Sequence, residues 1–287
     1  MFDKIKKNIS VILLVLTFIA GLSLLLYPTV SNWWNQMHST RLAENYASDV
    51  SRMSDEEYES LIEGAQSFNE ILRMQIDRYR LPAELSQQYE DSLNIDGDGM
   101  IGLIEIPSIQ VKSPIYHGTS DQTLQHYIGH LEGTSLPIGG IGTHAVLSGH
   151  RGLASAMLFT DLDKLTEGDY FMITVLDNLM TYQIDQIKIV LPSEMNDLII
   201  ESDKDLVTLV TCTPYGVNTH RILVRGHRVD NLPDDFVNAR NEAIIINRNL
   251  VAIGVAVVLG IGIVAGDRIK RAMRNRHRKQ KEEFEEK

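Results

Sequence analysis

The chain has 287 residues, of which 44% are hydrophobic and 23% charged, so it is long enough to bury a substantial core. Its formal net charge is −11, although basic residues gather near both ends, and the acidic excess therefore lies in the middle. An acidic central region argues against nucleic acid as a partner of that region.

The first predicted element is the apolar segment 9–30, which follows a lysine-rich start at residues 1–8. A segment of about 20 apolar residues is enough to cross a bilayer as a helix. A cleavable signal peptide has a similar pattern, but no small-x-small cleavage site follows, and Trp33 and Trp34 stand where an interfacial anchor is expected. We therefore predict a retained transmembrane helix over residues 9–30, with residues 1–8 in the cytoplasm.

Residues 31–99 are predicted to form an extracytoplasmic helical extension. Ser54 and Glu57 have the spacing of a capping box, and apolar residues at helical spacing follow them. Pro82 predicts the end of that helix, and a second, short helix is expected over residues 84–93. Amphipathic helices of this kind are typical of elements that pack on a neighbouring domain.

Residues 94–105 have the ligand spacing of a calcium-binding loop. The candidate ligands at positions 1, 3, 5 and 12 are Asn94, Asp96, Asp98 and Glu105. A helix must follow such a loop, but β-branched residues and Pro107 follow this one, so the pattern also fits an acidic turn that leads into a strand. We predict no cofactor and keep these residues as a weak candidate for a metal site.

From residue 100 the pattern changes to short β-prone segments separated by Gly, Pro, Asn and Asp. The segments are 101–106, 145–147, 170–176, 180–191, 206–211 and 222–224. Many short strands with few helices favour a barrel or a sandwich over a doubly wound sheet. We predict a single β domain over residues 100–231.

A second apolar segment, residues 250–266, follows a predicted linker at 232–249. It is short for a membrane span, and a buried core helix is the alternative. The basic residues of segment 267–287 come directly after it and are typical of the cytoplasmic side of a span. A nucleic-acid-binding arm is a second interpretation of this tail, but its position beside an apolar run favours the membrane surface. Two spans would place the region between them outside the cytoplasm.

Cys212 is the only cysteine in the sequence. Extracytoplasmic domains normally use cysteines in pairs, as disulfides, and a single cysteine has no internal partner. A solitary cysteine is more often a small core residue than a nucleophile. However, Cys212 follows the predicted strand 206–211 and precedes a turn, where a side chain can face a cleft.

A cysteine nucleophile needs a group that activates it, and histidine is the usual choice because its pKa lies near neutrality. Of the nine histidines, His144 and His150 flank the predicted strand 145–147, and His150 lies in the turn that follows it. The residues alone favour His150 without proving it. Arg221 and Arg225 fall on one face of the next strand by period-2 alternation, so either is a candidate to lie beside the thiol.

These residues resemble a known family. The segment 208–212, Thr-Leu-Val-Thr-Cys, with Arg221 nine residues after the cysteine, resembles the TLxTC…R signature of sortases. Residues 148–150, Ser-Gly-His, are similar to the segment that carries their catalytic histidine. The longer stretches 130–137 and 213–221 are similar to class C sortases, which polymerise pilins. The resemblance covers the predicted β domain, and the two apolar segments agree with it.

The resemblance implies an eight-stranded β-barrel with an N-terminal helical extension, flanked by two transmembrane helices. It implies that Cys212 is the nucleophile, His150 the general acid/base, and Arg221 the group that stabilises the substrate or its oxyanion. Arg225 and His144 are then structural or peripheral. The implied reaction cleaves an LPxTG-like sorting motif between Thr and Gly, forms a thioester, and transfers the acyl group to a lysine amine of another pilin subunit, outside the cell membrane.

Three other functions compete with this one. A housekeeping sortase would use a cell-wall precursor amine, and a cysteine protease would use water. A pilus subunit would need an LPxTG motif before its span, but residues 232–236, Leu-Pro-Asp-Asp-Phe, lack the Thr-Gly pair. The chain also departs from many class C sortases, because residues 40–100 contain no Asp-Pro-aromatic lid motif. Either the autoinhibitory lid is absent or the turn 96–98 has replaced it.

Overall fold

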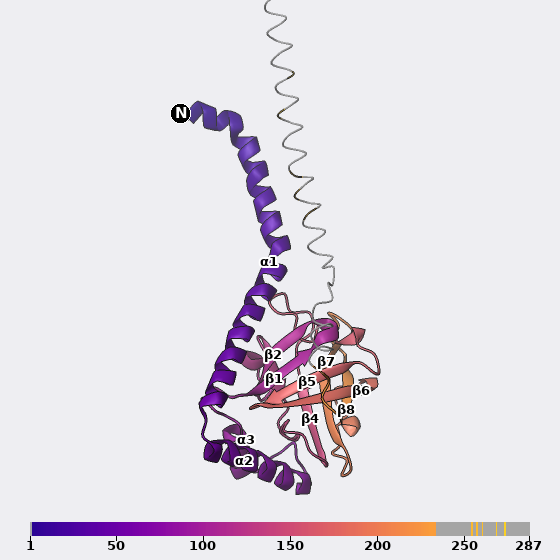
Figure 1. Cartoon of the computed structure of the whole chain (residues 1–287). Coiled ribbons are helices and arrows are strands. Elements are labelled where there is room, and N and C mark those ends of the chain that lie inside the picture. The colour runs from indigo at the N-terminus through magenta and orange to yellow at the C-terminus, as the bar shows by residue number, and fades with distance from the viewer. Residues whose placement is uncertain are drawn as a thin grey trace, which may run out of the picture. The chain divides into compact units, whose positions relative to one another are not determined.

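The computed structural model of the chain describes residues 2–233 and the isolated positions 254, 257, 260, 268 and 273. The chain divides into two compact units, one over Val30–Ala243 and the other over Met1–Thr29 with Ile244–Lys287. The barrel and its packed helices belong to the first unit (Figure 1). The predicted linker 232–249, second span 250–266 and tail 267–287 lie almost wholly outside the described residues.

Three helices precede the barrel: α1 (Phe2–Arg52), α2 (Asp55–Met74) and α3 (Ala83–Asp91). Within α1, the stretch Leu13–Arg52 has an apolar window of mean hydropathy 2.1 in which no residue is buried. Among the described residues it is the one helix long and apolar enough to cross a membrane. The predicted N-terminal anchor therefore lies in a helix, as expected.

The capping box predicted for α2 is confirmed. The Ser54 hydroxyl accepts a hydrogen bond from the Glu57 amide at 3.3 Å, and the Glu57 carboxylate accepts one from the Ser54 amide at 3.0 Å. The predicted end of this helix is wrong, because α2 stops at Met74 and Pro82 instead stands at the N-terminus of α3. Proline is well tolerated at a helix start, where its missing N–H has no helical partner to lose.

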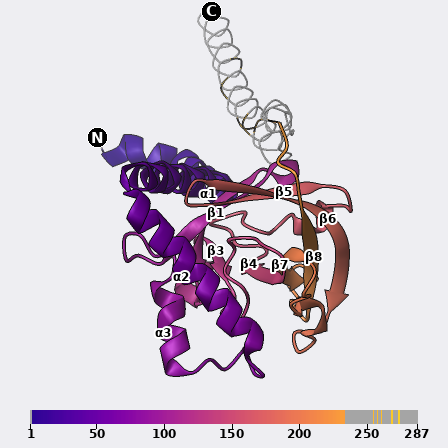
Figure 2. The same cartoon turned by 60° about the horizontal axis from the view of Figure 1, so that its bottom comes forward.

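The eight-stranded barrel implied by the family resemblance is confirmed. Its strands are β1 (Met100–Ile106), β2 (Val111–His117), β3 (Ile128–His130), β4 (Thr143–Ser148), β5 (Tyr170–Val175), β6 (Asn178–Val190), β7 (Asp205–Thr213) and β8 (His220–Val229). They close in the order β1-β2-β3-β4-β7-β8-β6-β5 (Figure 2). Short helices lie in the connections: η1 (Pro107–Ile109), α4 (Asp121–Leu124), η2 (Leu162–Lys164) and η3 (Asn196–Leu198).

The strands β2 and β3 are missing from the sequence-based prediction. Pro114 lies inside β2, opposite Leu103 of β1, and a proline within a strand argues against a strand when the sequence is all that is known. Strand β3 has three residues and pairs in parallel with the end of β2, where Ile115 lies opposite Ile128. Both strands depend on partners that are distant in sequence.

The barrel interior forms the main core, and α2 and α3 extend it. Ile104, Leu209 and Val224 are fully buried within this core, which also includes Phe68 and Leu72 of α2. Figures 1 and 2 both place α2 and α3 together beside one end of the barrel. The helical extension thus belongs to the same folded unit as the barrel.

A side chain of α2 also joins the extension to the barrel through two hydrogen bonds. Asn69 is buried, donates to the Leu136 carbonyl at 3.1 Å, and accepts from the Leu136 amide at 2.7 Å. The amide group of Asn69 therefore satisfies both backbone groups of a residue in the β3–β4 connection.

The helix α3 packs on the barrel through a group of buried aromatic rings. The Tyr89 hydroxyl lies 2.9 Å from Nδ1 of His130, and it accepts a hydrogen bond from the Gly118 amide at 2.9 Å. The His117 ring meets the Tyr89 ring edge-on, with centroids 4.6 Å apart. Burial lowers the pKa of His117 to about 4 and that of His130 to about 3, so both rings are neutral at neutral pH.

The candidate calcium loop leads into a strand. The side chains of Asn94 and Asp98 accept hydrogen bonds from the amides of Gly99 and Met100, each at 2.9 Å. Glu105 lies on β1 and pairs at 2.7 Å with Lys112 of β2, so it does not close the loop. Within the described residues, no group of three or more His, Cys, Asp or Glu side chains is arranged to hold a metal ion.

Replacement of Asn69 by alanine should lower the free energy of unfolding by about 2 kcal/mol, because the buried Leu136 amide and carbonyl lose their partners. The comparison is Glu63→Ala, on the exposed face of the same helix. Thermal unfolding of the full-length chain in detergent measures both. Equal effects of the two substitutions would contradict the docking role of Asn69.

Acidification should destabilise the barrel through His117. Its pKa is near 4 in the folded state and about 6.5 when unfolded, so the unfolded chain binds more protons between these values and stability falls as the pH drops through this window. His117→Phe should reduce the stability lost between pH 7 and pH 5 by about 1–2 kcal/mol. His126→Phe, at an exposed position, should leave that loss unchanged. The same pH dependence in wild type and His117→Phe would exclude this interpretation.

Candidate active site

The orientation of the Cys212 side chain follows from the alternation along β7. Val207 and Leu209 belong to the barrel interior, whereas Val210 packs in a separate small cluster on the opposite face of the strand. Side chains two residues apart point to the same face of a strand, so Cys212 shares the outer face with Val210. Its thiol is free and partly exposed, which places it on the outside of the barrel wall.

Strand β8 brings Arg221 beside Cys212. In the antiparallel pair β7–β8, Cys212 lies directly opposite Arg221. Directly opposite residues carry their side chains on the same face, with Cβ atoms about 4.5–5.5 Å apart. The Arg221 guanidinium donates hydrogen bonds to the carbonyl of Asn218, in the turn before β8, at 3.2 Å and to that of His220, the first residue of the strand, at 3.0 Å. Arg225, the other candidate, lies opposite Thr208, four positions further along the strand from the thiol.

Strand β4 flanks β7 on its other side and leads to His150. The parallel register places Ser148 beside Val210, and the Gly149 amide donates to the Val210 carbonyl at 3.1 Å. A side chain at Gly149 would collide with Ile128 and Phe159 of the interior, so this position faces inward. The neighbouring residue His150 therefore follows on the outer side, at the end of the strand next to Cys212.

Cys212 and Arg221 thus lie on the adjacent strands β7 and β8, and His150 follows the end of β4, the strand on the other side of β7. Arg151, which the sequence analysis did not single out, also reaches this end, since its guanidinium donates to the Thr213 hydroxyl at 2.9 Å. The sequence feature that could have pointed to Arg151 is its position directly after His150. The contact itself joins residues 62 positions apart and has no local pattern.

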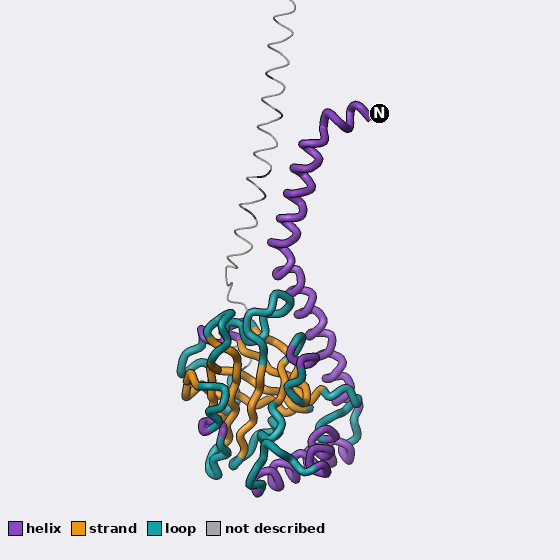
Figure 3. Tube along the Cα trace, turned by 180° about the vertical axis from the view of Figure 1, so that it is seen from behind, coloured by secondary structure: helices purple, strands orange, loops and turns teal. Residues whose placement is uncertain are grey.

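A small apolar cluster continues the outer face away from Cys212. Val146, Leu198 and Leu223 are buried in it, with Leu131 and Val210 partly buried beside them. Leu198 belongs to η3, in the long connection between β6 and β7. The connection therefore covers the outer face of strands β4, β7 and β8 on one side of the thiol. Figure 3 shows the strands in orange and the loops and turns that connect them in teal.

Comparisons with known proteins agree with this geometry. The family model of the sortase domain matches residues 104–229. The crystal structure of sortase C1 from Streptococcus agalactiae is 49% identical to the chain, which covers all of that structure over 67% of its own length, with a TM-score of 0.65. The chain belongs to the sortase family.

Two further relatives show how similar the chain is to individual sortases. Sortase C from Clostridium perfringens, solved with a C-terminal cell-wall sorting motif, is 45% identical, and the match covers 67% of this chain and 100% of that one with a TM-score of 0.59. Sortase A from Listeria monocytogenes is 27% identical over 77% of this chain and 90% of its own length. This sortase is therefore a cysteine transpeptidase similar to the class C, pilus-polymerising enzymes.

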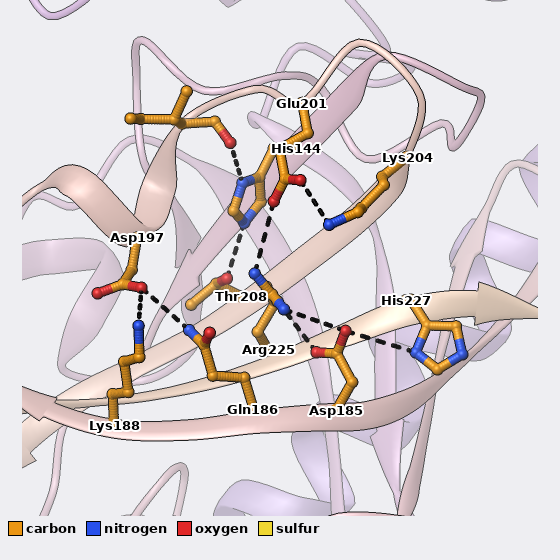
Figure 4. Close-up of polar contacts among 11 residues, drawn as sticks. His144, Asp185, Gln186, Lys188, Asp197, Glu201, Lys204, Thr208, Arg225 and His227 are labelled. Atoms are coloured by element: carbon orange, nitrogen blue, oxygen red, sulfur yellow. Dashed lines mark hydrogen bonds and ion pairs between the residues drawn. The ribbon is translucent and has the colours of Figure 1, made fainter.

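The β6–β7 connection of this sortase is fastened to the barrel by a polar network (Figure 4). Arg225 binds Asp185 of β6 through two hydrogen bonds of 3.0 and 3.2 Å and also contacts Glu201 of the connection at 3.6 Å. Asp197 of η3 pairs with Lys188 and accepts from Gln186. These contacts assign Arg225 to the support of the connection, which agrees with the structural role expected for it.

His144 completes the network from β4. Its Nδ1 lies 2.8 Å from the Ile199 carbonyl, which only accepts, so Nδ1 carries the proton and Nε2 accepts from the Thr208 hydroxyl at 2.7 Å. Burial lowers the pKa of His144 to about 4, which keeps the ring neutral in this arrangement. Both ring nitrogens are occupied, so the geometry supports a structural role for His144.

Proposed function

We propose that Cys212 is the nucleophile of this sortase, His150 its general acid/base, and Arg221 the donor that stabilises the substrate carbonyl or its oxyanion. The observation that carries the proposal is the pairing of Cys212 with Arg221 across β7 and β8 on the outer face of the barrel. His150 follows β4 on the other side of Cys212, so the proposed general acid/base and the Arg221 guanidinium lie on opposite sides of the thiol. The sortase signature supports the same three assignments.

In the first half-reaction the Cys212 sulfur attacks the threonine carbonyl of an LPxTG-like motif. The C–N bond to glycine breaks, and the proton carried by His150 passes to the departing glycine amine. Negative charge develops on the carbonyl oxygen before this bond breaks. Arg221, held by the carbonyls of Asn218 and His220, supplies fixed positive charge beside that oxygen. Such preorganised charge is usually a large part of acyl-transfer catalysis.

In the second half-reaction an amine attacks the thioester. His150 removes the proton of the attacking nitrogen, the new amide bond forms, and the Cys212 thiolate leaves. We propose that the amine is a lysine side chain of another pilin subunit, so that the product is an isopeptide bond. The similarity to class C sortases supports this acceptor, and the Clostridium perfringens relative, solved with a C-terminal cell-wall sorting motif, supports the donor.

We also propose the membrane arrangement expected from the sequence. Residues 1–8 would lie in the cytoplasm, residues 9–30 would span the membrane, and the helical extension 31–99 and catalytic domain 100–231 would lie outside. The apolar window in α1 supports this anchor. An extracytoplasmic catalytic domain has access to exported pilins that carry sorting motifs.

Acyl-enzyme formation tests the catalytic assignments. Full-length protein in detergent, mixed with a Leu-Pro-x-Thr-Gly peptide, should gain the mass of the acyl fragment on Cys212, as measured by mass spectrometry. Cys212→Ala should form none, because the attacking sulfur is missing. His150→Ala should slow acylation about 10²–10⁴-fold, the typical contribution of a general acid. Arg221→Met should slow it about 10²–10³-fold, as expected for loss of an oxyanion donor.

Arg225→Met is the matched control for Arg221, because both side chains lie on the same face of β8. It should retain acylation within about threefold of wild type, since Arg225 contacts the supporting network and not the thiol. Full activity of Cys212→Ala would refute the nucleophile. Retained activity in Arg221→Met with loss in Arg225→Met would reverse the arginine assignment.

The fate of the acyl-enzyme tests the acceptor. Incubation with candidate pilins should give ladders that resist sodium dodecyl sulfate, because isopeptide bonds link the subunits, and substitution of the acceptor lysine should remove the ladder. Preferential transfer to an amino-terminal glycine peptide would instead favour a cell-wall anchoring enzyme. Hydrolysis that no added amine diverts would identify a protease.

A further inference from the structure

The loop that carries His150 is held by the backbone on both sides of this residue. The Thr211 hydroxyl donates to the Gly149 carbonyl at 2.7 Å, and the Phe159 amide donates to the His150 carbonyl at 3.2 Å. Beyond these contacts, the loop leaves the sheet and returns to η2. These two bonds fix the main chain at His150, but the loop beyond it still needs a connection to the end of β7.

Arg151 makes that connection. Its side chain is 9% exposed, although it is the cationic residue of a surface loop. One end of the guanidinium donates to the Thr213 hydroxyl at 2.9 Å, and the other pairs with Asp163 of η2. Thr213 directly follows Cys212, so a single planar group joins the residue after the histidine, the residue after the cysteine, and the helix that receives the loop.

A contribution to the stability of the fold does not explain the contacts of Arg151 well. The Nε of Arg151 is buried, and none of the described residues accepts a hydrogen bond from it. Asp163 is 43% exposed, so solvent screens the ion pair. A buried cation with an unsatisfied donor is expensive to desolvate, and well-packed apolar replacements are often equally stable.

We propose that Arg151 is a positioning residue that keeps the His150 imidazole and the Cys212 thiol at the separation and orientation needed for proton transfer between them. The inference rests on the proposed roles of Cys212 and His150. The planar guanidinium matters because it binds two partners that lie in different directions, whereas a lysine ammonium on a flexible chain holds one of them. Loss of the bridge should displace the pair without removing either reactive group.

The reactivity of Cys212 toward iodoacetamide between pH 5 and pH 9 tests this inference on the full-length chain in detergent. In wild type the rate should depend on His150, because an imidazolium beside the sulfur favours the thiolate. Arg151→Met should lower the rate at pH 7 about tenfold and shift the profile toward that of His150→Ala. In the His150→Ala background, Arg151→Met should change the rate less than about twofold, because its effect passes through His150.

Acylation by the Leu-Pro-x-Thr-Gly peptide gives a second measurement. Arg151→Met should lower kcat about 10- to 100-fold with KM nearly unchanged, as expected when reacting groups are displaced by about 1 Å. Arg151→Lys should recover part of this loss. The control is Lys164→Met, which removes the exposed Lys164–Asp161 pair from the same short helix and should change neither rate nor profile.

Two results would overturn the inference. They are an alkylation profile of Arg151→Met that superimposes on wild type, and effects of Arg151→Met and His150→Ala that simply add in the double variant. If Arg151→Met does not fold, Asp163→Asn decides, because it weakens one end of the bridge and should shift the profile in the same direction. Alkylation needs no sorting motif, so a chain that shows the predicted profiles but acylates no such peptide would refute the proposed substrate and leave the role of Arg151 standing.

Discussion

The active site depends on the register of β7 between β4 and β8. Val207 and Leu209 must face the barrel interior, and the period of two along a strand then forces Cys212 outward. A slip of one residue would bury the thiol and expose the core residues, so hydrophobic packing along the whole strand fixes the direction of one sulfur. The antiparallel pairing with β8 places Arg221 on the same side. The geometry of the proposed catalytic residues and the formation of the core therefore have the same cause.

A site on the outer face of a barrel wall needs a segment that shields it from solvent and still lets a substrate reach the thiol. The β6–β7 connection provides the cover, because Leu198 packs on Val146 and Leu223 while Arg225 and His144 hold its backbone and acidic side chains. Arg78, from the segment between α2 and α3, adds a hydrogen bond of 2.7 Å to the Leu198 carbonyl. The helical extension thus supports the same wall, which links the folding of residues before the barrel to the shape of the site.

The sequence was informative where the relevant pattern was local. Cys212 at a strand end, the alternation of Arg221 and Arg225, and the capping box at Ser54 each lie within a few residues. It failed where partners were distant: β2 carries Pro114, β3 is three residues long, and both form only because neighbouring strands pair with them. Pro82 was assigned to the wrong helix end, since proline is compatible with either side of a boundary. The contact of Arg151 with Thr213 has no sequence signal at all.

The choice of histidine can be argued from burial and register among the strands that flank β7. His144 has both ring nitrogens engaged and a pKa near 4, so at neutral pH it lacks the second ring proton of an imidazolium, and the Ile199 carbonyl holds the proton on Nδ1. His220 lies opposite Thr213, which faces away from the Cys212 side. His227 lies opposite Leu206, six residues and about 20 Å along the strand from the thiol. His150 remains: it is partly buried, as Cys212 is, and it follows β4 at the strand end beside the thiol, so burial and register support the proposal that His150 is the general acid.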